Sequence, residues 1–540
     1  MLRALSRCSR PISTTSFARS YSMSTPDPTP IASSSSSIIS ESAPVDAPLL
    51  PTSPESALKE SLNTASSLLH QDLPVAFPTE TVYGLGASAL SSVAVKRIFA
   101  AKGRPSDNPL IVHVSSRDML FDLLPTNSTD GRPVIPKMYE ALMDRFWPGP
   151  LSLIFPLDPK GKGKAVEVDS RLTEVRNPPR RAVAPEVTAG QPSLCVRMPS
   201  HPLALSLIRH SDLPLAAPSA NLSSRPSPTT AAHVVEDLGH GRGLGAILDG
   251  GSCRVGVEST VVDWVAPADG AQGEGELRVL RAGGVSAEEI EACLREAGFG
   301  ASAAAAAEEE KGSTETGAPQ RIRVYARDFR SEDLEERPTT PGMKYKHYAP
   351  GNAKVVLVKP VAGASVDGPL PSLQDLVQLT ALTHAPAAVA ADDGDDSDST
   401  SHHPRFRVGL MLTDTTLSAL GATSLSAVSP PCELVRLPPA PPSPFANLAD
   451  DEESNLPDLD EIDVLSYSLG SRERPLEAAQ RLFAGLRFLD HYVPDNDTSG
   501  KVGVDLIFVE AVPEEGVGLA VMERARKAAG GQPGEMEFQL

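Results

Sequence analysis

The stretch AKGRPSDNPLIVH, residues 101–113, places Lys102 and Arg104 on a proline-stiffened turn, directly before an apolar run that ends in His113. Two cations held close together by a stiff turn suit a phosphate or a carboxylate. Side chains alternate between the faces of a strand, so His113 shares its face with Ile111 and need not lie in the core. A solvated basic turn and a histidine satisfied within a sheet are the ordinary alternatives.

A third cation stands inside an apolar segment. Arg197 occurs late in SLCVRMP, residues 193–199, where an isolated buried guanidinium would be costly. It therefore requires an anionic partner. A structural ion pair and a ligand carboxylate explain this requirement equally well.

Several loops combine glycines, small residues and hydroxyl groups. They are PTETVYGLG (78–86), LAAPSANLSSRPSP (215–228), GVEST (256–260) and LRAGG (280–284). Each is an ordinary loop when taken alone, because Gly, Ser and Thr are common in turns. Together, cations, hydroxyls and small residues recur at the ends of strands, which indicates an anion-binding cleft built from several loops. The residues predict a phosphorylated or nucleotide ligand and leave open whether a ligand carboxylate accompanies it.

One further motif, PGMKYKHYAP (341–350), interleaves basic residues with tyrosines between two prolines. It is compatible with a base-stacking tether, a lid, or a linker that packs between domains. The chain contains no P-loop, no Gly-x-Gly-x-x-Gly after a strand, no nucleophile elbow and no His-Glu-x-x-His.

The elements that would position these loops follow from hydrophobic spacing. Leu58, Leu62, Ala65 and Leu69 predict a helix, and Leu90, Ala94, Ile98 and Ala101 predict another that Gly103 ends. Strands are predicted at 75–77, 110–114 and 151–157, and units of a strand with its loop at 193–199, 213–221, 246–251, 259–265 and 277–284. Many short strands with few helices predict an α+β or mixed α/β sheet domain over residues 55–298.

A second domain is predicted over residues 351–540, where strand-like AKVVLV, FRVGLML and VDLIFVEAV alternate with two helical segments. Residues 299–350 are predicted to link the two domains. Surface or low-complexity insertions are predicted at 158–185, 385–403 and 438–462.

Composition limits the class of protein. The chain has 540 residues and a formal charge of -20, with a pI near 5.0, which argues against general coating of nucleic acid. Its five cysteines are scattered, so neither a disulfide framework nor a zinc site is expected. No apolar run approaches the roughly 18–20 residues that span a bilayer, so no membrane insertion is predicted.

Residues 1–54 are predicted to be a targeting segment followed by a disordered region rich in Ser, Pro and Thr. Arg3, Arg7 and Arg10 share one helical face and no acid precedes Asp27, which is typical of a mitochondrial transit peptide. Met23 could start a cytosolic form. A cytoplasmic protein with an additional mitochondrial form is therefore expected.

Taken together, PTETVYGLG, KGRPSDNPLIVH, WPGPLSLI, VRMPSHPLAL, APSANLSSRPSPT, GVESTVVD, LRAGG and PGMKYKHYAP resemble the YrdC-type threonylcarbamoyl-AMP synthases in their two-domain form. The resemblance implies an α/β protein, with a twisted mixed-sheet α+β catalytic domain followed by a smaller Rossmann-like α/β domain. It also implies condensation of L-threonine, bicarbonate or CO2, and ATP into threonylcarbamoyl-AMP and pyrophosphate. A downstream transferase then modifies tRNAs that read ANN codons.

The resemblance also assigns roles to individual residues. It implies that threonine contacts Thr79, His113, Arg197, the Ala217 backbone and Ser259. It implies that ATP contacts Arg104, Asn108, Ser193, Ser219, Ser227, Arg281 and Tyr345, with Lys102 and Asn221 completing the cluster. Lys102 and Arg104 would stabilise charge on the phosphates. Mg2+ is expected to be held by ATP and water, with no metal site in the protein itself.

A non-catalytic RNA-binding module is the alternative function. A concave basic surface and the tyrosines of KYKHY, residues 344–348, could contact RNA weakly in either case. Pyrophosphate release that depends on threonine and bicarbonate distinguishes the two.

Overall fold

The computed structural model describes residues 46–127, 131–133, 135–157, 176–265, 276–299, 322–325, 327–331, 334, 339, 347–362, 370–384, 405–421, 432–434, 462–494, 497, 500–531 and 535–539. The targeting segment, Tyr345, the insertion at 385–403 and most of those at 158–185 and 438–462 lie outside these residues.

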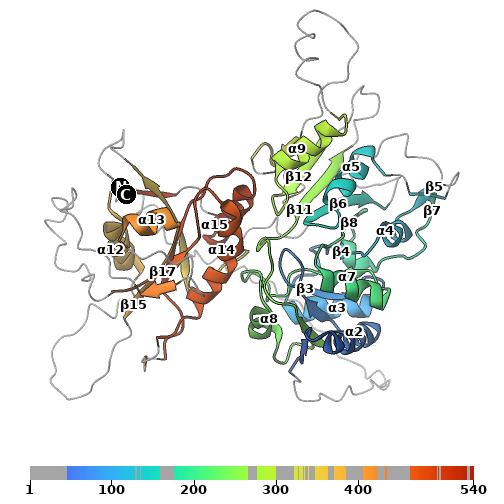
Figure 1. The fold of residues 1–540 in the computed structure, drawn as a ribbon, viewed down its shortest axis with the longest axis horizontal. Coiled ribbons are helices and arrows are strands. Elements are labelled where there is room, and N and C mark those ends of the chain that lie inside the picture. The colour runs from blue at the N-terminus through green and yellow to red at the C-terminus, as the bar shows by residue number, and fades with distance from the viewer. Residues whose placement is uncertain are drawn as a thin grey trace, which may run out of the picture. The chain divides into compact units, whose positions relative to one another are not determined.

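The first part of the chain forms an eleven-stranded mixed sheet (Figure 1). Its strands lie in the order β1-β10-β2-β3-β9-β4-β8-β6-β11-β12-β13. Their bounds are β1 Leu49–Pro51, β2 Val75–Phe77, β3 Gly84–Ser88, β4 Val112–His113, β6 Leu151–Pro156, β8 Ser193–Arg197, β9 Leu215–Ala216, β10 Ala246–Asp249, β11 Thr260–Val265, β12 Glu276–Arg281 and β13 Ile322–Val324. A separate small sheet pairs β5 Thr126–Asn127 with β7 Arg176–Asn177.

Eight helices of the described residues belong to this first domain. They are α2 Glu55–His70, α3 Ser92–Lys102, α4 Arg117–Leu123, α5 Lys137–Phe146, α6 Pro185–Thr188, α7 Pro202–Ser211, α8 Ala231–Leu238 and α9 Ala287–Glu296. Helix α2 packs against α7, and α5 packs against α9 (Figure 1). Their apolar faces contribute to one continuous core, which also includes residues of the second domain.

Helix α3 ends where the sequence predicts. The Ser91 hydroxyl accepts a hydrogen bond from Ala94 N–H at its start, at 3.3 Å. Gly103 ends the helix with φ 60°, a left-handed conformation that glycine adopts without the penalty of a Cβ atom. The turn after Gly103 carries Arg104 toward β4.

The first domain begins earlier than predicted, because β1 pairs in parallel with β10 at the sheet edge. Order therefore starts before residue 55, and the prediction of disorder up to residue 54 is wrong for this strand. Pro51 is tolerated because an edge strand has one side without ladder hydrogen bonds. Three other elements lie in segments predicted to be loop, insertion or linker: β3, β7 and β13.

Strand β3 begins within the segment predicted to be a loop, because it consists mostly of small residues. Gly86 lies against the Phe77 ring of β2, and a Cβ atom there would stand 2.5 Å from Cε1 of that ring. Small residues carry none of the β-branched pattern that predicts a strand from sequence.

The second sheet has six strands in the order β16-β17-β15-β18-β14-β19. Their bounds are β14 Lys354–Val361, β15 Phe406–Leu412, β16 Cys432–Leu434, β17 Ile462–Ser468, β18 Leu506–Glu510 and β19 Met536–Gln539. All pair in parallel except β16, which runs antiparallel to β17. The predicted Rossmann-like pattern of alternating strands and helices is confirmed, and it includes the unpredicted strand β17.

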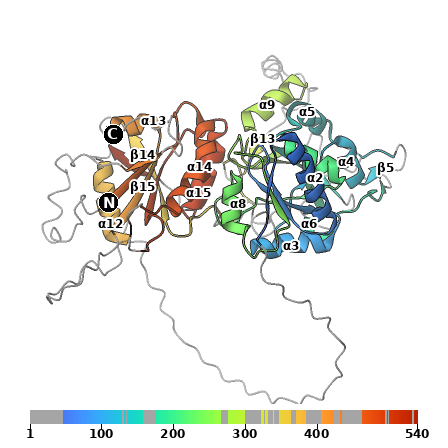
Figure 2. The same ribbon diagram turned by 60° about the horizontal axis from the view of Figure 1, so that its bottom comes forward.

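The helices of this second domain cover both faces of its sheet (Figures 1 and 2). Helices α12 Leu373–His384 and α13 Asp414–Ala419 lie on one face, and α14 Pro475–Asp490 and α15 Gly518–Ala528 lie side by side on the other. Parallel strands covered on both faces form nearly continuous apolar runs, as residues 506–509 of β18 do. In the part of the chain that the structure describes, no helix is long and apolar enough to cross a membrane.

Candidate functional site

A pocket of about 710 Å³, counted out to its open mouth, lies where strand ends of the first sheet meet. Its described lining contains the cations Lys102, Arg104, Arg197, Arg225 and Arg281, and a single carboxylate, Glu258. The remaining lining residues are Thr79, Thr81, Val82, Gly84, Ile111, His113, Ala217, Pro218, Ser219, Asn221, Ser223, Ser224, Ser259, His347 and Tyr348. The predicted anion-binding cleft thus has its counterpart in one concave, largely cationic site.

At one end of the pocket, Arg197 is fixed by the loop after β2. Its Nη2 lies 2.9 Å from Oε1 of Glu80, and its Nη1 donates to the Thr81 hydroxyl at 2.9 Å. The other Glu80 oxygen accepts from Ser200 N–H at 3.0 Å. Both partners are buried, so each needs the other to offset the cost of desolvation.

The structure therefore gives Arg197 the structural ion pair that the sequence left open. This ion pair does not use every hydrogen-bond donor of the guanidinium, because Nε is buried and has no partner among the described residues. Arg197 also lines the pocket. A ligand carboxylate would thus meet a guanidinium whose orientation is already set by Glu80 and Thr81.

His113 lies next to Arg197, because β4 and β8 are paired and the two residues are register partners. Ile111 and His113 line the pocket while Leu110, Val112 and Val114 lie in the main core, as the strand alternation predicts. Burial, and secondarily the charge of Arg197, lowers the pKa of His113 to about 3. The ring is therefore neutral near pH 7 and acts through hydrogen bonds, not through charge.

Replacing His113 with asparagine is expected to change the pH dependence of stability. The folded pKa of about 3 lies below the unfolded value of about 6.5, so wild type loses stability as pH falls below 6.5. An asparagine can still donate to Ile111 O but does not titrate. The stability difference between wild type and His113→Asn should shift by about 2 kcal/mol in favour of the variant between pH 7 and pH 5. Urea unfolding at both pH values measures it, and a constant difference would contradict the neutral, buried state.

Three hydroxyl and backbone groups complete this end. Thr79 donates to Val82 O at 2.6 Å and lies 2.7 Å from the Thr81 hydroxyl. Ser259 lies 2.8 Å from the Ser152 hydroxyl, and Ala217 N–H donates to Ile111 O. The five residues that the resemblance assigns to threonine, Thr79, His113, Arg197, Ala217 and Ser259, all line the pocket.

At the other end, Lys102 projects from the last turn of α3. Its Nζ donates to Asn221 O at 2.6 Å and to Ser219 O. Burial, reinforced by Arg104, lowers the pKa of Lys102 well below its ordinary value. The ammonium group is thus held beside the loop after β9 at an electrostatic cost that a polyanion would offset.

Arg104 is less tightly bound by the protein. Its Nη2 lies 3.5 Å from Asn108 O and 3.4 Å from Pro109 O, both long, and its buried Nε has no partner in the described residues. Burial lowers its pKa to about 10, so it stays charged. A buried, weakly satisfied guanidinium is well suited to receive a phosphate.

Arg281, at the end of β12, is hydrogen-bonded to Ser259. Its Nη2 donates to Ser259 O at 2.9 Å and to the Ser259 hydroxyl at 3.1 Å, and Nε donates to the same carbonyl oxygen. A cation is thereby fixed beside a residue assigned to threonine.

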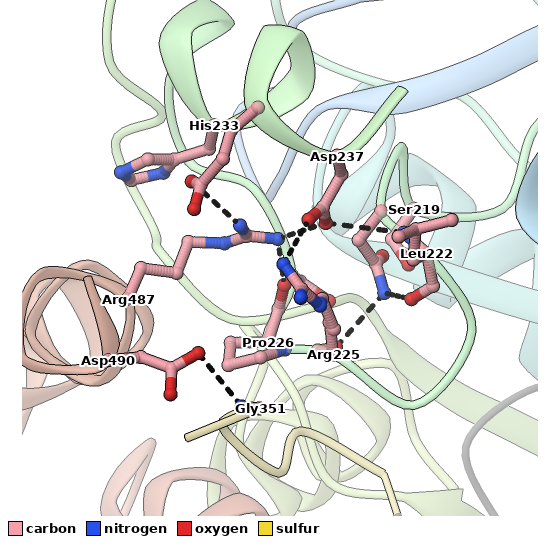
Figure 3. A network of polar contacts seen from close by, with 12 residues as sticks. Ser219, Leu222, Arg225, Pro226, His233, Asp237, Gly351, Arg487 and Asp490 are labelled. Carbon is pink, nitrogen blue, oxygen red and sulfur yellow. Dashed lines mark hydrogen bonds and ion pairs between the residues drawn. The ribbon is translucent and has the colours of Figure 1, made fainter. Parts of the chain in front are cut away.

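Helix α14 of the second domain contacts the loop of residues 219–226, directly and through Asp237 (Figure 3). Arg487 of α14 donates to Asp237 and to Pro226 O, each at 2.6 Å. Asp237 in turn accepts from Leu222 N–H at 3.2 Å and pairs with Arg225. Because Lys102 binds carbonyl oxygens of this loop, its position depends on a helix of the other domain.

Four residues that the resemblance assigns to ATP lie outside the described lining. Asn108 is buried beside Arg104, and Ser193 lies at the start of β8, the opposite end from Arg197. The Ser227 hydroxyl donates to Glu258 Oε1 at 2.6 Å. Tyr345 lies outside the described residues. Arg104, Ser219, Asn221, Arg281 and Lys102 do line the pocket.

Among the charged and aromatic residues of the lining, four have no role in the sequence prediction: Arg225, Glu258, His347 and Tyr348. All four lie within motifs described above, in which the resemblance assigns ligand contacts to neighbouring residues instead. The Tyr348 ring packs on Phe483 of α14, with centroids 5.0 Å apart. Burial, and then the charge of Arg104, lowers the pKa of His347 to about 4, so it also stays neutral near pH 7.

Over the described residues, no group of three or more His, Cys, Asp and Glu side chains could hold a metal ion. The carboxylate in the pocket, Glu258, is already engaged by Ser227 and by Arg524. The donor set of the pocket therefore suits an anion and not a protein-bound cation.

Comparison with known proteins identifies two family models along the chain. Residues 67–283 match a model described as telomere recombination, of the Sua5, YciO and YrdC proteins. Residues 285–530 match the threonylcarbamoyl-AMP synthase C-terminal domain.

The chain is also similar to curated threonylcarbamoyl-AMP synthases. It is 34% identical to that of Bacillus subtilis over 469 residues, covering 87% of this chain and 92% of the relative. A Pyrococcus abyssi enzyme is likewise 34% identical, over 87% of this chain and 94% of its own. The Schizosaccharomyces pombe enzyme is 44% identical, but over 57% of this chain and 65% of the relative.

The chain is also similar to solved structures of a Sua5 protein. A double variant of Pyrococcus abyssi Sua5 aligns with a TM-score of 0.56 at 30% identity, covering 91% of this chain and 98% of that one. P. abyssi Sua5 complexed with L-threonine aligns with a TM-score of 0.52 at 30% identity, covering 89% and 96%.

Proposed function

Because the chain belongs to the two-domain threonylcarbamoyl-AMP synthase family of enzymes, we propose that it condenses L-threonine, bicarbonate or CO2, and ATP into threonylcarbamoyl-AMP and pyrophosphate. One observation carries the proposal beyond the family name. A single pocket combines a guanidinium and neutral hydrogen-bonding groups at one end with buried cations at the other, of which Arg104 is only weakly satisfied by the protein. Such a site suits an amino acid placed beside a polyphosphate.

We assign L-threonine to the Arg197 end. The amino-acid carboxylate would contact the guanidinium that Glu80 orients, and the threonine hydroxyl would contact neutral His113 or Ser259. P. abyssi Sua5 has been solved with L-threonine, which supports threonine as the amino acid for its relatives. Serine would lose the contacts of the methyl group, so it should be used less well.

The chemistry requires no protein nucleophile. The threonine amine adds to CO2 and releases a proton, giving a carbamate. A carbamate oxygen then attacks the α-phosphorus of ATP, and the bond to the β-phosphate breaks, releasing pyrophosphate. Lys102, Arg104 and Arg281 would hold the phosphates and stabilise the charge that develops on them. Mg2+ would enter with ATP, held by phosphate oxygens and water.

We place the adenosine along an apolar face of the sheet that continues from the pocket. Ile111, Ile154 and Cys195 lie on this face, and Leu334 packs on it. Ser193 shares this face with Cys195 and Arg197, because side chains alternate along β8. The base would have to displace Leu334 and could then reach the Ser193 hydroxyl.

Replacing Ser193 with alanine tests this placement. Losing one neutral hydrogen bond should raise KM for ATP by about two- to tenfold and leave KM for threonine unchanged. Ser211→Ala is the matched control, since Ser211 is a buried serine of α7 that donates to Leu207 O within its own helix. An unchanged KM for ATP would place the nucleotide within the pocket lining alone, and the assignment of Ser193 would be wrong.

The function itself is tested by pyrophosphate release from ATP. We expect release from the purified full chain only when threonine and bicarbonate are both present, with a lower rate for serine. Release that ignores threonine, or no release from a folded protein, would refute the enzyme assignment. RNA binding without pyrophosphate release would favour the non-catalytic module.

We further propose that the product is used by a separate transferase that modifies tRNAs reading ANN codons. Threonylcarbamoyl-AMP is a mixed anhydride that hydrolyses in water, so the next enzyme must accept it directly or quickly. A cytoplasmic protein with a mitochondrial form started at Met1 also remains a proposal. Separate tagging of the products of Met1 and Met23 tests it, and a Met1 product that stays out of mitochondria would end it.

A further inference from the structure

Glu258 is the one carboxylate among the described residues that line an otherwise cationic pocket. It is nearly buried, with 8% of its surface exposed, and its Oε1 accepts from the Ser227 hydroxyl. An uncompensated negative charge at this position would oppose the binding of any phosphate.

Arg524 of α15, in the second domain, reaches this carboxylate. Its Nε donates to Glu258 Oε2 at 2.8 Å, and only 1% of its side chain is exposed. Its Nη1 donates to Ala282 O at 2.7 Å, just after β12, and to Ala520 O at 3.0 Å within its own helix. The guanidinium is thus held by groups of both domains and cannot turn away from Glu258 without losing them.

The charges around Glu258 keep it ionised. Burial alone would raise the pKa of this carboxyl, but Arg524, Arg281 and the Ser227 hydroxyl bring it down to about 2. The negative charge is therefore always present, and its compensation by Arg524 is required whenever the pocket is filled.

The loop that carries Glu258 is also pressed against the second domain. Gly256 has φ 81°, and a Cβ atom there would lie 2.4 Å from the carbonyl oxygen of Ala479 in α14. Gln480 of the same helix donates to Arg254 O at 2.6 Å. Only glycine allows this approach, so backbone and side-chain contacts both fix the loop to α14 and α15.

We propose that Arg524 is a positioning residue by which the second domain neutralises Glu258 and makes the pocket accept the triphosphate of ATP. The inference rests on the proposed function, because it takes ATP as the ligand of the cationic end. It assigns the second domain a part in nucleotide binding that it exerts through Glu258, without a contact of its own to the substrate.

Isothermal titration of the full chain with ATP, and separately with L-threonine, tests this role. Arg524→Met should weaken ATP binding at least about tenfold, the order expected when one uncompensated charge faces a polyanion at an effective dielectric constant near 20. Threonine binding should change less than about twofold. Arg526→Met is the matched control, since Arg526 lies on the same helix and pairs with Glu514 and Glu535.

The double variant Arg524→Met with Glu258→Gln distinguishes charge from packing. Removing the carboxylate should restore ATP affinity to within about threefold of wild type, whereas a purely structural defect would persist. No loss of ATP affinity in Arg524→Met, equal losses for both ligands, or no restoration overturns the proposal.

Three further outcomes remain decisive. If Arg524→Met does not fold, Glu258→Gln alone should bind ATP as tightly as wild type or more tightly, and a tenfold loss would overturn the proposal. A wild type that binds ATP but releases no pyrophosphate refutes the proposed function and leaves the comparison of affinities valid. A wild type that binds no ATP overturns both.

Discussion

Replacing Lys102 with methionine is expected to lower kcat/KM for ATP by about a thousandfold. On the proposed function, Lys102 supplies positive charge to the phosphates. It also donates to Ser219 O and Asn221 O, so the substitution removes a charge and leaves two buried carbonyl groups without their donor. Methionine preserves the length of the side chain and the packing of α3. The measurement is the initial rate of pyrophosphate release over a range of ATP concentrations.

The matched control is Lys96→Met on the same helix. The Lys96 side chain is 68% exposed and pairs with Glu186 at 3.2 Å, an arrangement that contributes little to stability. It should retain the wild-type rate. If Lys102→Met fell less than tenfold while keeping its fold, Lys102 would not be part of the phosphate site.

The second large effect concerns threonine. Arg197→Met alone would leave the Glu80 carboxylate buried without its cation and destabilise the protein by about 3–5 kcal/mol. The double variant Arg197→Met with Glu80→Gln removes both charges together. Its KM for threonine should rise about a hundredfold, because a charged hydrogen bond to the substrate carboxylate is lost, while KM for ATP stays within about threefold.

Glu80→Gln by itself is the informative companion. It leaves Arg197 in place with fewer competing acceptors, so threonine binding should be kept or strengthened. Equal increases of both Michaelis constants in the double variant would show that Arg197 supports the pocket as a whole and does not hold the threonine carboxylate.

Local sequence was sufficient to predict the elements that carry their own signals. The end of α3 at Gly103 follows from a left-handed cap, and the division of Ile111 and His113 from the core follows from strand alternation. Strands β6, β8 and β18 follow from apolar runs. In each case the information lies within a few residues, which is the range over which such patterns act.

Long-range contacts explain what sequence could not predict. The partner of Arg197 is Glu80, which is 117 positions away, and the partner of Glu258 is Arg524, which is 266 positions away. The sequence around Glu258, GVEST, does not indicate that its carboxylate faces the pocket. Strand β3 could not be predicted either, because its glycines are explained by the Phe77 ring of β2, against which they pack.

The site residues were predicted by resemblance and not by their own chemistry. A turn with two cations, an apolar strand with one arginine and several serine-rich loops each fit common structural roles. Only the fold shows that Lys102, Arg104, Arg197 and Arg281 converge on one pocket. The additional contributions of His347 and Tyr348 required the structure, because the motif that contains them offers several equivalent basic and aromatic residues.

The contact between Glu258 and Arg524 also has a consequence for synthesis on the ribosome. Translation completes the first sheet and its pocket long before α15 emerges, so Glu258 is made well ahead of the arginine that compensates it. During that interval the nascent first domain carries Glu258 among the cations of its pocket without the charge of Arg524 beside it. On the proposed function, the nascent chain would bind ATP poorly until α15 has docked, which would postpone formation of the reactive anhydride until the second domain has been made.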